Sequence, residues 1–321
     1  MHQPIGCVVA KKAAGVLEFL FLGGRFHVGS LGKQFTAAAI LHLTELGHFC
    51  LNACINDVLP KQYRSDLWSA VSIKHLLSHT SGIPDYAIER DYYAVIDGWA
   101  FEETIDGMIG EAKDRPLEFE PGAEFRYSNI GYTLLGEILQ RQTGRAFGDL
   151  VRDKLLLPIG MESSSIRDKD QVLTQGDPQG LRWDEETRVH VIDNAISLPV
   201  TPADGGLITT LDDFAIWVAA VYRDRSHPNL SPSSIELMLQ RTSPSTGYRW
   251  PERDQRGEAF YGLGLMRSGD LVMHEGSIVG YRSFFIYSCQ DDVLISVFSN
   301  NTHNNVFRIA AELFACHTEC R

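Results

Sequence analysis

The sequence FHVGSLGKQFTAAAILHLTEL, residues 26–46, predicts the central helix of the fold. Residues 31–46 are mostly Ala, Leu, Ile, Phe and Thr, and Gly47 follows them as a C-terminal stop signal. A helix that is apolar on nearly every side is a buried helix. We therefore expect a buried helix in which Lys33 and Gln34 are the strongly polar side chains near its start.

Strand patterns lie at the two ends of the chain, and helical patterns lie mostly between them. Short apolar runs at residues 7–10 and 16–22 predict two strands joined by a hairpin turn. Four more strands are predicted after residue 241, at residues 261–266, 271–274, 281–288 and 293–299. Helical periodicity is clearest at residues 131–142, 210–222 and 305–316.

This order predicts one sheet assembled from the two ends of the chain. The fold class we expect is α/β in the α+β sense: an antiparallel sheet flanked by the N- and C-terminal helices, plus an all-helical insertion domain. Residues 1–60 with 241–321 would form the sheet domain, and residues 61–240 a mainly helical domain. Ligand sites favour the contact between domains, so we expect the active site at this seam.

Length and composition exclude several classes of protein. The 321 residues are 44% hydrophobic and 22% charged, which is ordinary for a globular protein and excludes a disordered or fibrous chain. A net charge of −12 argues against nucleic acid or an anionic membrane as a partner, since both need a basic surface. No stretch approaches the roughly 20 apolar residues of a transmembrane helix, so none is expected. The sequence gives no indication of an oligomeric state.

Four of the six cysteines form two Cys-x-x-x-Cys pairs, Cys50 with Cys54 and Cys316 with Cys320. A shared zinc site would need all four to converge in space. Structural zinc sites more often have closely spaced ligands in turns, and a free cysteine is commonly a small buried hydrophobe. We therefore expect no zinc site at these cysteines.

The first candidate for chemistry is Ser30-x-x-Lys33 at the head of the central helix. Residues three apart share one face of a helix, so the two side chains should be neighbours. A buried amine with a lowered pKa helps a serine to lose its proton, and the helix N-terminus favours developing negative charge. The plainer interpretation is an N-cap serine and a solvated lysine. An apolar helix weakens that interpretation, because a buried unpaired charge is costly.

The second candidate is Tyr127-x-Asn129, which follows the turn at Pro121 and Gly122 and precedes the predicted helix 131–142. A tyrosine phenol transfers a proton if nearby cations lower its pKa, and an asparagine amide both donates to and accepts from a substrate amide. Taken alone, the pair is better interpreted as a packed tyrosine and an asparagine that caps the following helix.

The third candidate is His274-Glu275-Gly276-Ser277, at the end of an apolar strand. The metalloprotease motif His-Glu-x-x-His fails here, because its fifth position is Ile278. Gly276 allows another backbone to approach closely, and Gly276 and Ser277 could present N–H groups to an extended substrate.

Taken together, the three motifs resemble the serine β-lactamase and penicillin-binding-protein superfamily. The branch they resemble holds class C β-lactamases, D-alanyl-D-alanine carboxypeptidases, D-aminopeptidases and related esterases. The resemblance covers about residues 26–300, and further segments that share it lie at residues 26–38, 73–84, 121–135 and 205–210. It implies the same fold that the strand and helix order predicts.

The resemblance implies an acyl-enzyme mechanism that needs no metal and no cofactor, and it leaves the cysteine pairs outside that mechanism. Ser30 would be the acylated nucleophile, and Lys33 and Tyr127 would share its proton and return it to the leaving group. The backbone N–H groups of Ser30 and Ser277 would form the oxyanion hole.

The resemblance also implies the residues that bind substrate. Asn129 would hold the substrate amide, His274 would stand where many relatives have lysine or tryptophan, and Gly276 would line the substrate strand. A histidine is largely neutral near pH 7, so it would bind a substrate carboxylate less firmly than lysine. A D-amino-acid peptide or amide, or a small carboxylic ester, is therefore expected ahead of a β-lactam. Residues 86–112 and 176–193 are expected to shape the pocket.

The alternative is a non-catalytic penicillin-binding-like sensory or binding protein with the same fold. An α/β-hydrolase is not expected, since no Gly-x-Ser-x-Gly pentapeptide occurs, and Gly262-Leu263-Gly264 lacks the third glycine of a dinucleotide motif. Only 29 residues precede Ser30, fewer than relatives usually have, and they contain no secretory signal pattern. The chain as written is expected to be cytoplasmic, or periplasmic or extracellular if its N-terminus is incomplete.

Overall fold

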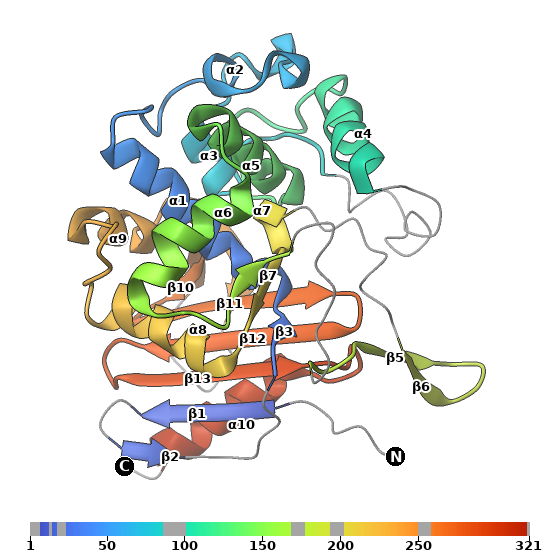
Figure 1. Ribbon diagram of the computed structural model, residues 1–321, viewed down its shortest axis with the longest axis vertical. Helices are drawn as coiled ribbons and strands as arrows, with labels where there is room; N and C mark the ends of the chain where they lie inside the picture. Colours follow the sequence, from blue (N-terminus) through green and yellow to red (C-terminus); the bar gives the residue numbers. More distant parts are fainter. Residues whose placement is uncertain are drawn as a thin grey trace.

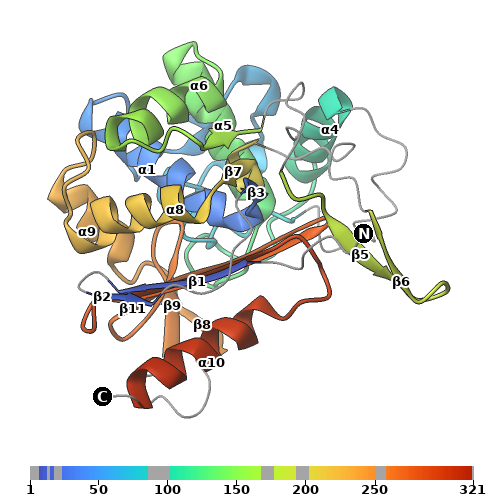
Figure 2. The same cartoon turned by 60° about the horizontal axis from the view of Figure 1, so that its bottom comes forward.

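The computed structural model describes residues 7–12, 15–17, 24–85, 101–167, 177–192, 202–249 and 258–319. An antiparallel sheet forms one layer, with most of the helices on one of its faces and the last helix on the other (Figures 1 and 2). Parts of three expected features lie outside the described residues: the strand at 16–22 beyond Leu17, the pocket-shaping segments 86–112 and 176–193, and Cys320.

The sheet is built from both ends of the chain, which confirms the prediction. Its strand order is β2-β1-β13-β12-β11-β10-β9-β8. The N-terminal strand β1 pairs antiparallel with β13, from Cys7 opposite Phe298 to Lys12 opposite Val293. The strands are β1 (Cys7–Lys12), β2 (Gly15–Leu17), β8 (Ser245–Arg249), β9 (Glu258–Tyr261), β10 (Met266–Ser268), β11 (Leu271–Ile278), β12 (Tyr281–Ser288) and β13 (Val293–Ser299).

The expected single strand at residues 261–266 is wrong: Tyr261 ends β9, Met266 begins β10, and residues 262–265 form a turn between them. Gly262 N donates to Leu265 O at 2.9 Å, and Gly264 has a φ of +79°. A φ in this range is readily adopted by glycine and interrupts an extended strand. The turn also lies on the central helix, because a Cβ at position 264 would be 2.8 Å from Lys33 O.

The central helix α1 (Lys33–Glu45) is buried, as its composition predicted. It begins two residues later than expected, because Gly29–Gly32 form a separate 3₁₀ turn, η1. The expected helix 131–142 is α5 (Asn129–Thr143), with Ser128 as its N-cap and Gly144 as its left-handed C-cap.

The expected helix 210–222 is α8 (Leu211–Val218), which continues through a π-helical turn, η7 (Ala219–Arg223). The last helix, α10 (Val306–Glu319), packs on β12 and β13 across the sheet from α1. It buries Ala310 and Phe314 against the sheet there.

The middle of the chain is mainly helical but also contains two small sheets. Its helices are α2 (Ile55–Val58), η2 (Lys61–Tyr63), η3 (Asp66–Trp68), α3 (Ile73–Leu77), α4 (Phe101–Lys113), α5, α6 (Phe147–Val151), η4 (Arg152–Leu156), η5 (Leu157–Ile159), α7 (Pro202–Gly205), α8, η7 and α9 (Pro232–Leu239). One small sheet joins β3 (Phe26–His27), β7 (Leu207–Thr209) and β4 (Ser165–Ile166), and the other is the hairpin of β5 (Leu181–Asp184) and β6 (Val189–Ile192).

One cluster of buried apolar side chains runs from the helical layer to the inner face of the sheet. Phe35 of α1, Ile138 of α5 and Phe285 of β12 belong to it. The division into two domains stays a prediction, since the described parts share this core.

Candidate active site

Ser30 lies where the helical layer meets the sheet, in the η1 turn against β11. Two glycines allow this close approach. A Cβ at Gly29 would lie 3.1 Å from Ser277 N, and a Cβ at Gly276 would lie 2.0 Å from Val28 O. Gly29 also has a φ of +52°, which glycine adopts without strain. The motifs around Ser30 and Gly276, 246 positions apart in the chain, are therefore in direct contact.

The edge of β11 is open beside Ser30. Within the described residues, β10 pairs with β11 only at Leu271–Met273, whereas β12 pairs with it along its whole length. From His274 to Ile278 this edge has no partner strand among the described residues, and η1 packs against the same part of β11 through its face at Gly276. Unpaired strand backbone is suited to an extended substrate.

Lys33 is wholly buried and makes three hydrogen bonds, so the solvated-lysine interpretation is wrong. Its Nζ donates to Ser30 Oγ at 3.1 Å, to Asn129 Oδ1 at 2.9 Å and to the backbone oxygen of Asp204 at 2.8 Å. These acceptors match the three N–H groups of an ammonium. When Lys33 is neutral, its lone pair is left for the Ser30 hydroxyl, which then donates.

The charged form of Lys33 is disfavoured in this position. Burial lowers the pKa of Lys33 from 10.5 to about 8, and the nearby Asp204 and Asp85 oppose this shift. A lysine with a pKa in this range is suited to accept a proton near neutral pH.

Tyr127 lies beside Lys33, but its pKa moves in the direction opposite to our expectation. Lys33 Nζ is 4.9 Å from the centre of the Tyr127 ring. Burial nevertheless raises the pKa of Tyr127 well above 10, and the proximity of Ser30 opposes this only in part. The loss of solvation outweighs the attraction of one cation, so Tyr127 is a neutral phenol. Its buried hydroxyl makes no hydrogen bond within the described part of the chain.

Asn129 is held by Asp85, a residue that the sequence reasoning missed. Asp85 Oδ2 accepts from Asn129 Nδ2 at 3.2 Å, and its Oδ1 accepts from the backbone N–H groups of Asn129 and Ile130, each at 3.0 Å. These bonds turn Asn129 Oδ1 towards Lys33 and leave one amide N–H for a substrate. The helix-cap role that we considered for Asn129 belongs to Ser128, assisted by Asp85.

His274 is buried and neutral, and both ring nitrogens are used within the protein. Nδ1 donates to Glu275 O at 2.6 Å, so Nε2 accepts from the Tyr261 hydroxyl at 2.9 Å. Burial lowers the pKa of His274 to about 3. The structure therefore gives His274 no ring nitrogen to offer a substrate carboxylate, unlike the weak interaction that we expected.

A cation that the sequence reasoning missed lies at the same edge. Arg282 of β12 is the cross-strand partner of Ser277, and its Nη1 donates to Ser277 Oγ. Cross-strand neighbours lie side by side on one face, a relation that depends on the register of β11 with β12. Glu275 lies on this face too; burial raises its pKa, and the nearby Arg282 opposes that shift only in part.

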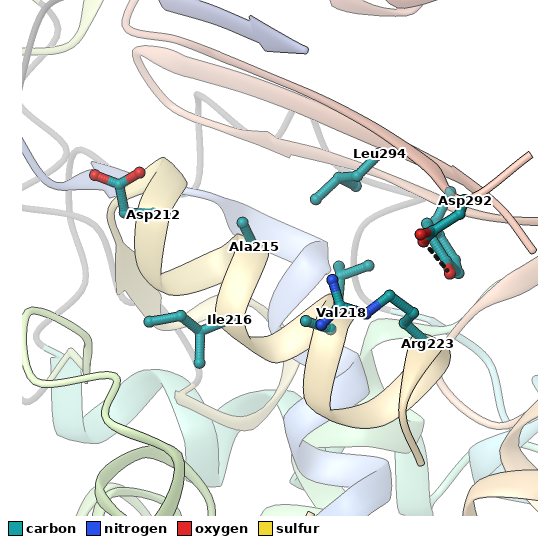
Figure 3. Close-up of a pocket in the computed structure, with 9 residues that line it drawn as sticks. Asp212, Ala215, Ile216, Val218, Arg223, Asp292 and Leu294 are labelled. Atoms are coloured by element: carbon teal, nitrogen blue, oxygen red, sulfur yellow. Dashed lines mark hydrogen bonds between the residues drawn. The ribbon is translucent and has the colours of Figure 1, made fainter. Parts of the chain in front are cut away.

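A separate pocket has a volume of about 230 Å³ (Figure 3). It is lined on one side by α8 and η7 and on the other by the strands β12 and β13. Three of its polar groups are paired: Tyr287 donates to Asp292 at 3.1 Å, and Arg223 binds Asp224. Its lining contains no serine, cysteine or histidine. We therefore place no hydrolytic chemistry there.

The described residues contain no group of three or more His, Cys, Asp or Glu side chains that could hold a metal ion. Cys50, Cys54 and Cys316 are free thiols, and Cys54 Sγ points to the backbone oxygens of Trp68 and Ser69. Among the described helices, none has the length and apolar character needed to cross a membrane.

Comparisons with known proteins agree with this geometry. The family model Beta-lactamase matches residues 23–315. The D-aminopeptidase of Gluconobacter oxydans is 27% identical over 281 residues, covering 86% of this chain and 49% of that protein. Penicillin-binding protein 4* of Bacillus subtilis is 25% identical over 324 residues, covering 89% of this chain and 65% of that protein. The chain spans about half to two thirds of the length of these relatives.

Among solved structures, the chain is similar to the octameric penicillin-binding protein homologue from Pyrococcus abyssi, with a TM-score of 0.80 and 26% sequence identity. The match covers 98% of this chain and 73% of the Pyrococcus chain. A sheet covered by helices, with a serine and a buried lysine in contact where they meet, defines the class of serine β-lactamases and penicillin-binding proteins. The chain belongs to the Beta-lactamase family, a family of serine hydrolases. The family resemblance found in the sequence and the expected fold are thereby confirmed.

Proposed function

We propose that the protein hydrolyses an amide or ester bond through an acyl-enzyme on Ser30. The observation that carries this proposal is the 3.1 Å contact between Lys33 Nζ and Ser30 Oγ, with Lys33 wholly buried. A lysine with a pKa of about 8 is neutral in about a tenth of molecules at pH 7. That fraction provides a general base next to the nucleophile.

The proposed reaction begins when the neutral Lys33 amine takes the Ser30 proton as Oγ bonds to the substrate carbonyl carbon. The carbonyl electrons move to its oxygen, which the backbone N–H groups of Ser30 and Ser277 stabilise. The C–N or C–O bond then breaks and the leaving group departs with a proton. Water attacks the acyl-enzyme by the same proton transfers and frees Ser30.

In this scheme Tyr127 passes the proton from Lys33 to the leaving group. The raised pKa keeps the phenol protonated at rest, so it has a proton to give to the leaving group and recovers one from the Lys33 ammonium. The oxygen therefore carries negative charge only transiently. Lys33 Nζ lies 4.9 Å from the centre of the Tyr127 ring and Ser30 interacts with the phenol, so Tyr127 is a neighbour of both groups in the relay.

The activity should rise with pH through the titration of Lys33. Below its pKa of about 8, kcat/KM should increase about tenfold per pH unit, and above it should level off, because the reacting form is the neutral amine. The measurement is kcat/KM for p-nitrophenyl acetate from pH 5.5 to 9.5, corrected for spontaneous hydrolysis. A profile that is flat from pH 6 to 9 would contradict the role of Lys33.

For the substrate we propose a D-amino-acid peptide or amide, or a small carboxylic ester. The D-aminopeptidase relative supports the D-amino-acid class. Arg282 beside Ser277, rather than the neutral His274, is then the cation that would meet a substrate carboxylate. The test is a panel of a p-nitrophenyl ester, D-amino-acid amides with their L-enantiomers, a D-Ala-D-Ala peptide and a chromogenic cephalosporin. Turnover of L-amino-acid amides alone would contradict the proposed class.

The contribution of Arg282 is measured by replacing it with methionine, which keeps the length of the side chain and removes its charge. For Arg282→Met, the ratio of kcat/KM for a D-Ala-D-Ala peptide to that for its C-terminal amide should fall about 10-fold or more, the usual effect of losing a charged hydrogen bond. Arg241→Met is the matched control, at an exposed arginine outside the site. An unchanged ratio would remove Arg282 from carboxylate binding.

A non-catalytic binding protein is separated from the enzyme by intact-protein mass spectrometry after incubation with a penicillin. A stable adduct indicates a reactive serine with slow deacylation. No adduct, combined with no turnover across the panel, would contradict the proposed function.

A further inference from the structure

We propose that His79 is a positioning residue that holds Tyr127 in place for proton transfer. The inference rests on the proposed function and assigns a role to the segment at residues 73–84, which the mechanism above does not use. His79 follows α3 and is wholly buried. It acts through Tyr127 and does not touch the reacting atoms in this scheme.

His79 binds the backbone N–H groups of the two residues on either side of Tyr127. Arg126 N donates to the backbone oxygen of His79 at 2.9 Å, and Ser128 N donates to His79 Nδ1 at 3.1 Å. One residue thus fixes the backbone immediately before and after the tyrosine. Because the segment 126–128 is a loop leading into α5, these two bonds set the direction in which the Tyr127 side chain leaves the backbone.

The imidazole ring also supports the phenol ring directly. The two ring centres are 4.2 Å apart with an angle of 34° between the planes. Behind the imidazole, Tyr261 packs at 4.6 Å and Tyr132 at 5.1 Å. Rings enclosed in this way lose rotational freedom, so Tyr127 is held in one orientation.

The protonation state of the His79 imidazole follows from its contacts. Since Nδ1 accepts a hydrogen bond from Ser128 N, the ring is neutral with its proton on Nε2. Burial and the proximity of Lys33 and His274 hold the pKa of His79 well below 6.5, which preserves this state. With Nδ1 engaged and Nε2 protonated, His79 is not itself available as a general base.

Backbone hydrogen bonds also hold His79 and the residues that follow it. His79 has a φ of +57°, an uncommon value for a residue other than glycine. Gly122 N donates to Thr80 O at 2.7 Å, and Glu118 N donates to Gly82 O at 2.8 Å. Segments 79–82 and 118–126 are thus joined by three backbone hydrogen bonds. Strained backbone held by its surroundings is typical of functional sites.

The test compares two nearly isosteric variants, His79→Asn and His79→Leu. Asparagine keeps an acceptor close to the position of Nδ1 and tolerates a positive φ, whereas leucine has no acceptor. With a D-amino-acid amide or an ethyl ester, whose leaving group must be protonated, His79→Leu should lower kcat about 100-fold with KM changed less than about threefold, and His79→Asn should lower kcat less than about 10-fold. Ile55→Ala in α2 is the control for general loss of stability, and melting curves are recorded for every variant.

A double-mutant cycle with Tyr127→Phe distinguishes positioning from packing. If His79 acts through the Tyr127 hydroxyl, His79→Leu should lower kcat less than about threefold in the Tyr127→Phe background. Additive effects of the two substitutions, or equal kcat values for the Asn and Leu variants, would overturn the inference. If His79→Leu does not fold, His79→Gly takes its place, because glycine adopts this φ freely and also lacks the acceptor.

The wild type and Ser30→Ala are measured in the same series. Absence of Ser30-dependent turnover would overturn the proposed function and this inference with it. Ser30-dependent turnover with an additive cycle would overturn the role of His79 alone.

Discussion

Ser30→Ala should abolish the hydrolysis of p-nitrophenyl acetate, with a fall in kcat of about 10⁴-fold or more. The substitution deletes one oxygen, the atom that forms the acyl bond. Lys33 keeps its hydrogen bonds to Asn129 and to the backbone of Asp204, so the site should otherwise be preserved. The loss therefore reports on the nucleophile rather than on the fold. The measurement is initial rate at pH 8, with a melting curve to show that the variant is folded.

Acylation is the second readout for Ser30→Ala. A penicillin or a reactive ester that adds mass to the wild-type protein should add none to the variant. Ser163→Ala is the matched control, because this serine lies outside the site and its exposed side chain makes no hydrogen bond in the described structure. Turnover by Ser30→Ala at the wild-type rate would refute the mechanism, even if the protein proved to be a hydrolase.

Lys33→Met should lower kcat/KM about 10²–10⁴-fold, the usual contribution of a general base. Methionine has a similar length and no charge, so the helix should tolerate it. The residual activity should no longer rise through pH 8, since the titrating group is gone. The measurement is the pH profile of the residual rate, and a profile that still rises with a midpoint near pH 8 would assign the titration to another group.

The same substitution should change how stability depends on pH. In the folded protein the pKa of Lys33 is about 8, against 10.5 ordinarily, so between these values the unfolded chain binds more protons and stability of the wild type rises with pH. Below pH 8 the folded protein bears the full cost of the buried charge, about 3 kcal/mol. Lys33→Met lacks this dependence.

Relative to the wild type, Lys33→Met should therefore be most stable below pH 8. As the pH rises to 10.5, the wild type should gain about 3 kcal/mol in the free energy of unfolding relative to the variant. The oxygens of Asn129 and Asp204 lose a donor in the variant, which costs about 1–3 kcal/mol each at every pH. The pH dependence of the difference is thus the diagnostic quantity. Urea denaturation at pH 7 and pH 10 measures it, and an equal difference at both values would contradict the lowered pKa.

The sequence predicted the features of the fold that depend on local patterns. The apolar composition of residues 31–46 predicted a buried helix, and the strand patterns at both ends predicted a single sheet, because periodicity reflects which side of an element is covered. The turn at Gly264 escaped this reasoning, since apolar residues alternate with Gly262 and Gly264 there in the manner of a strand. A close contact with Lys33 O, made across the fold, accompanies the positive φ there.

In the candidate site, too, local patterns predicted some contacts and missed others. Ser30 and Lys33 are three positions apart at the start of a helix, so their contact follows from the helical repeat. The hydrogen bonds of Lys33 to Asn129 and Asp204 span 96 and 171 positions, and no local pattern indicates them. Asp85 and Arg282 were missed for this reason. The position of Asp85 in the site depends on the approach of its loop to α5, and that of Arg282 on the register of β11 with β12.

The direction of the pKa shifts was decided by the tertiary structure alone. Sequence reasoning placed a cation beside Tyr127 and a weakly basic histidine at His274, and both expectations neglected the depth of burial. Desolvation depends on everything packed around a group, here the rings of Tyr127, Tyr261 and His79 among them. The sequence by itself determined the family, the sheet and the pairing of a serine with a lysine. Only the packing of distant segments decided which groups are neutral and how they are oriented, because solvation and long-range hydrogen bonds exist only in the folded chain.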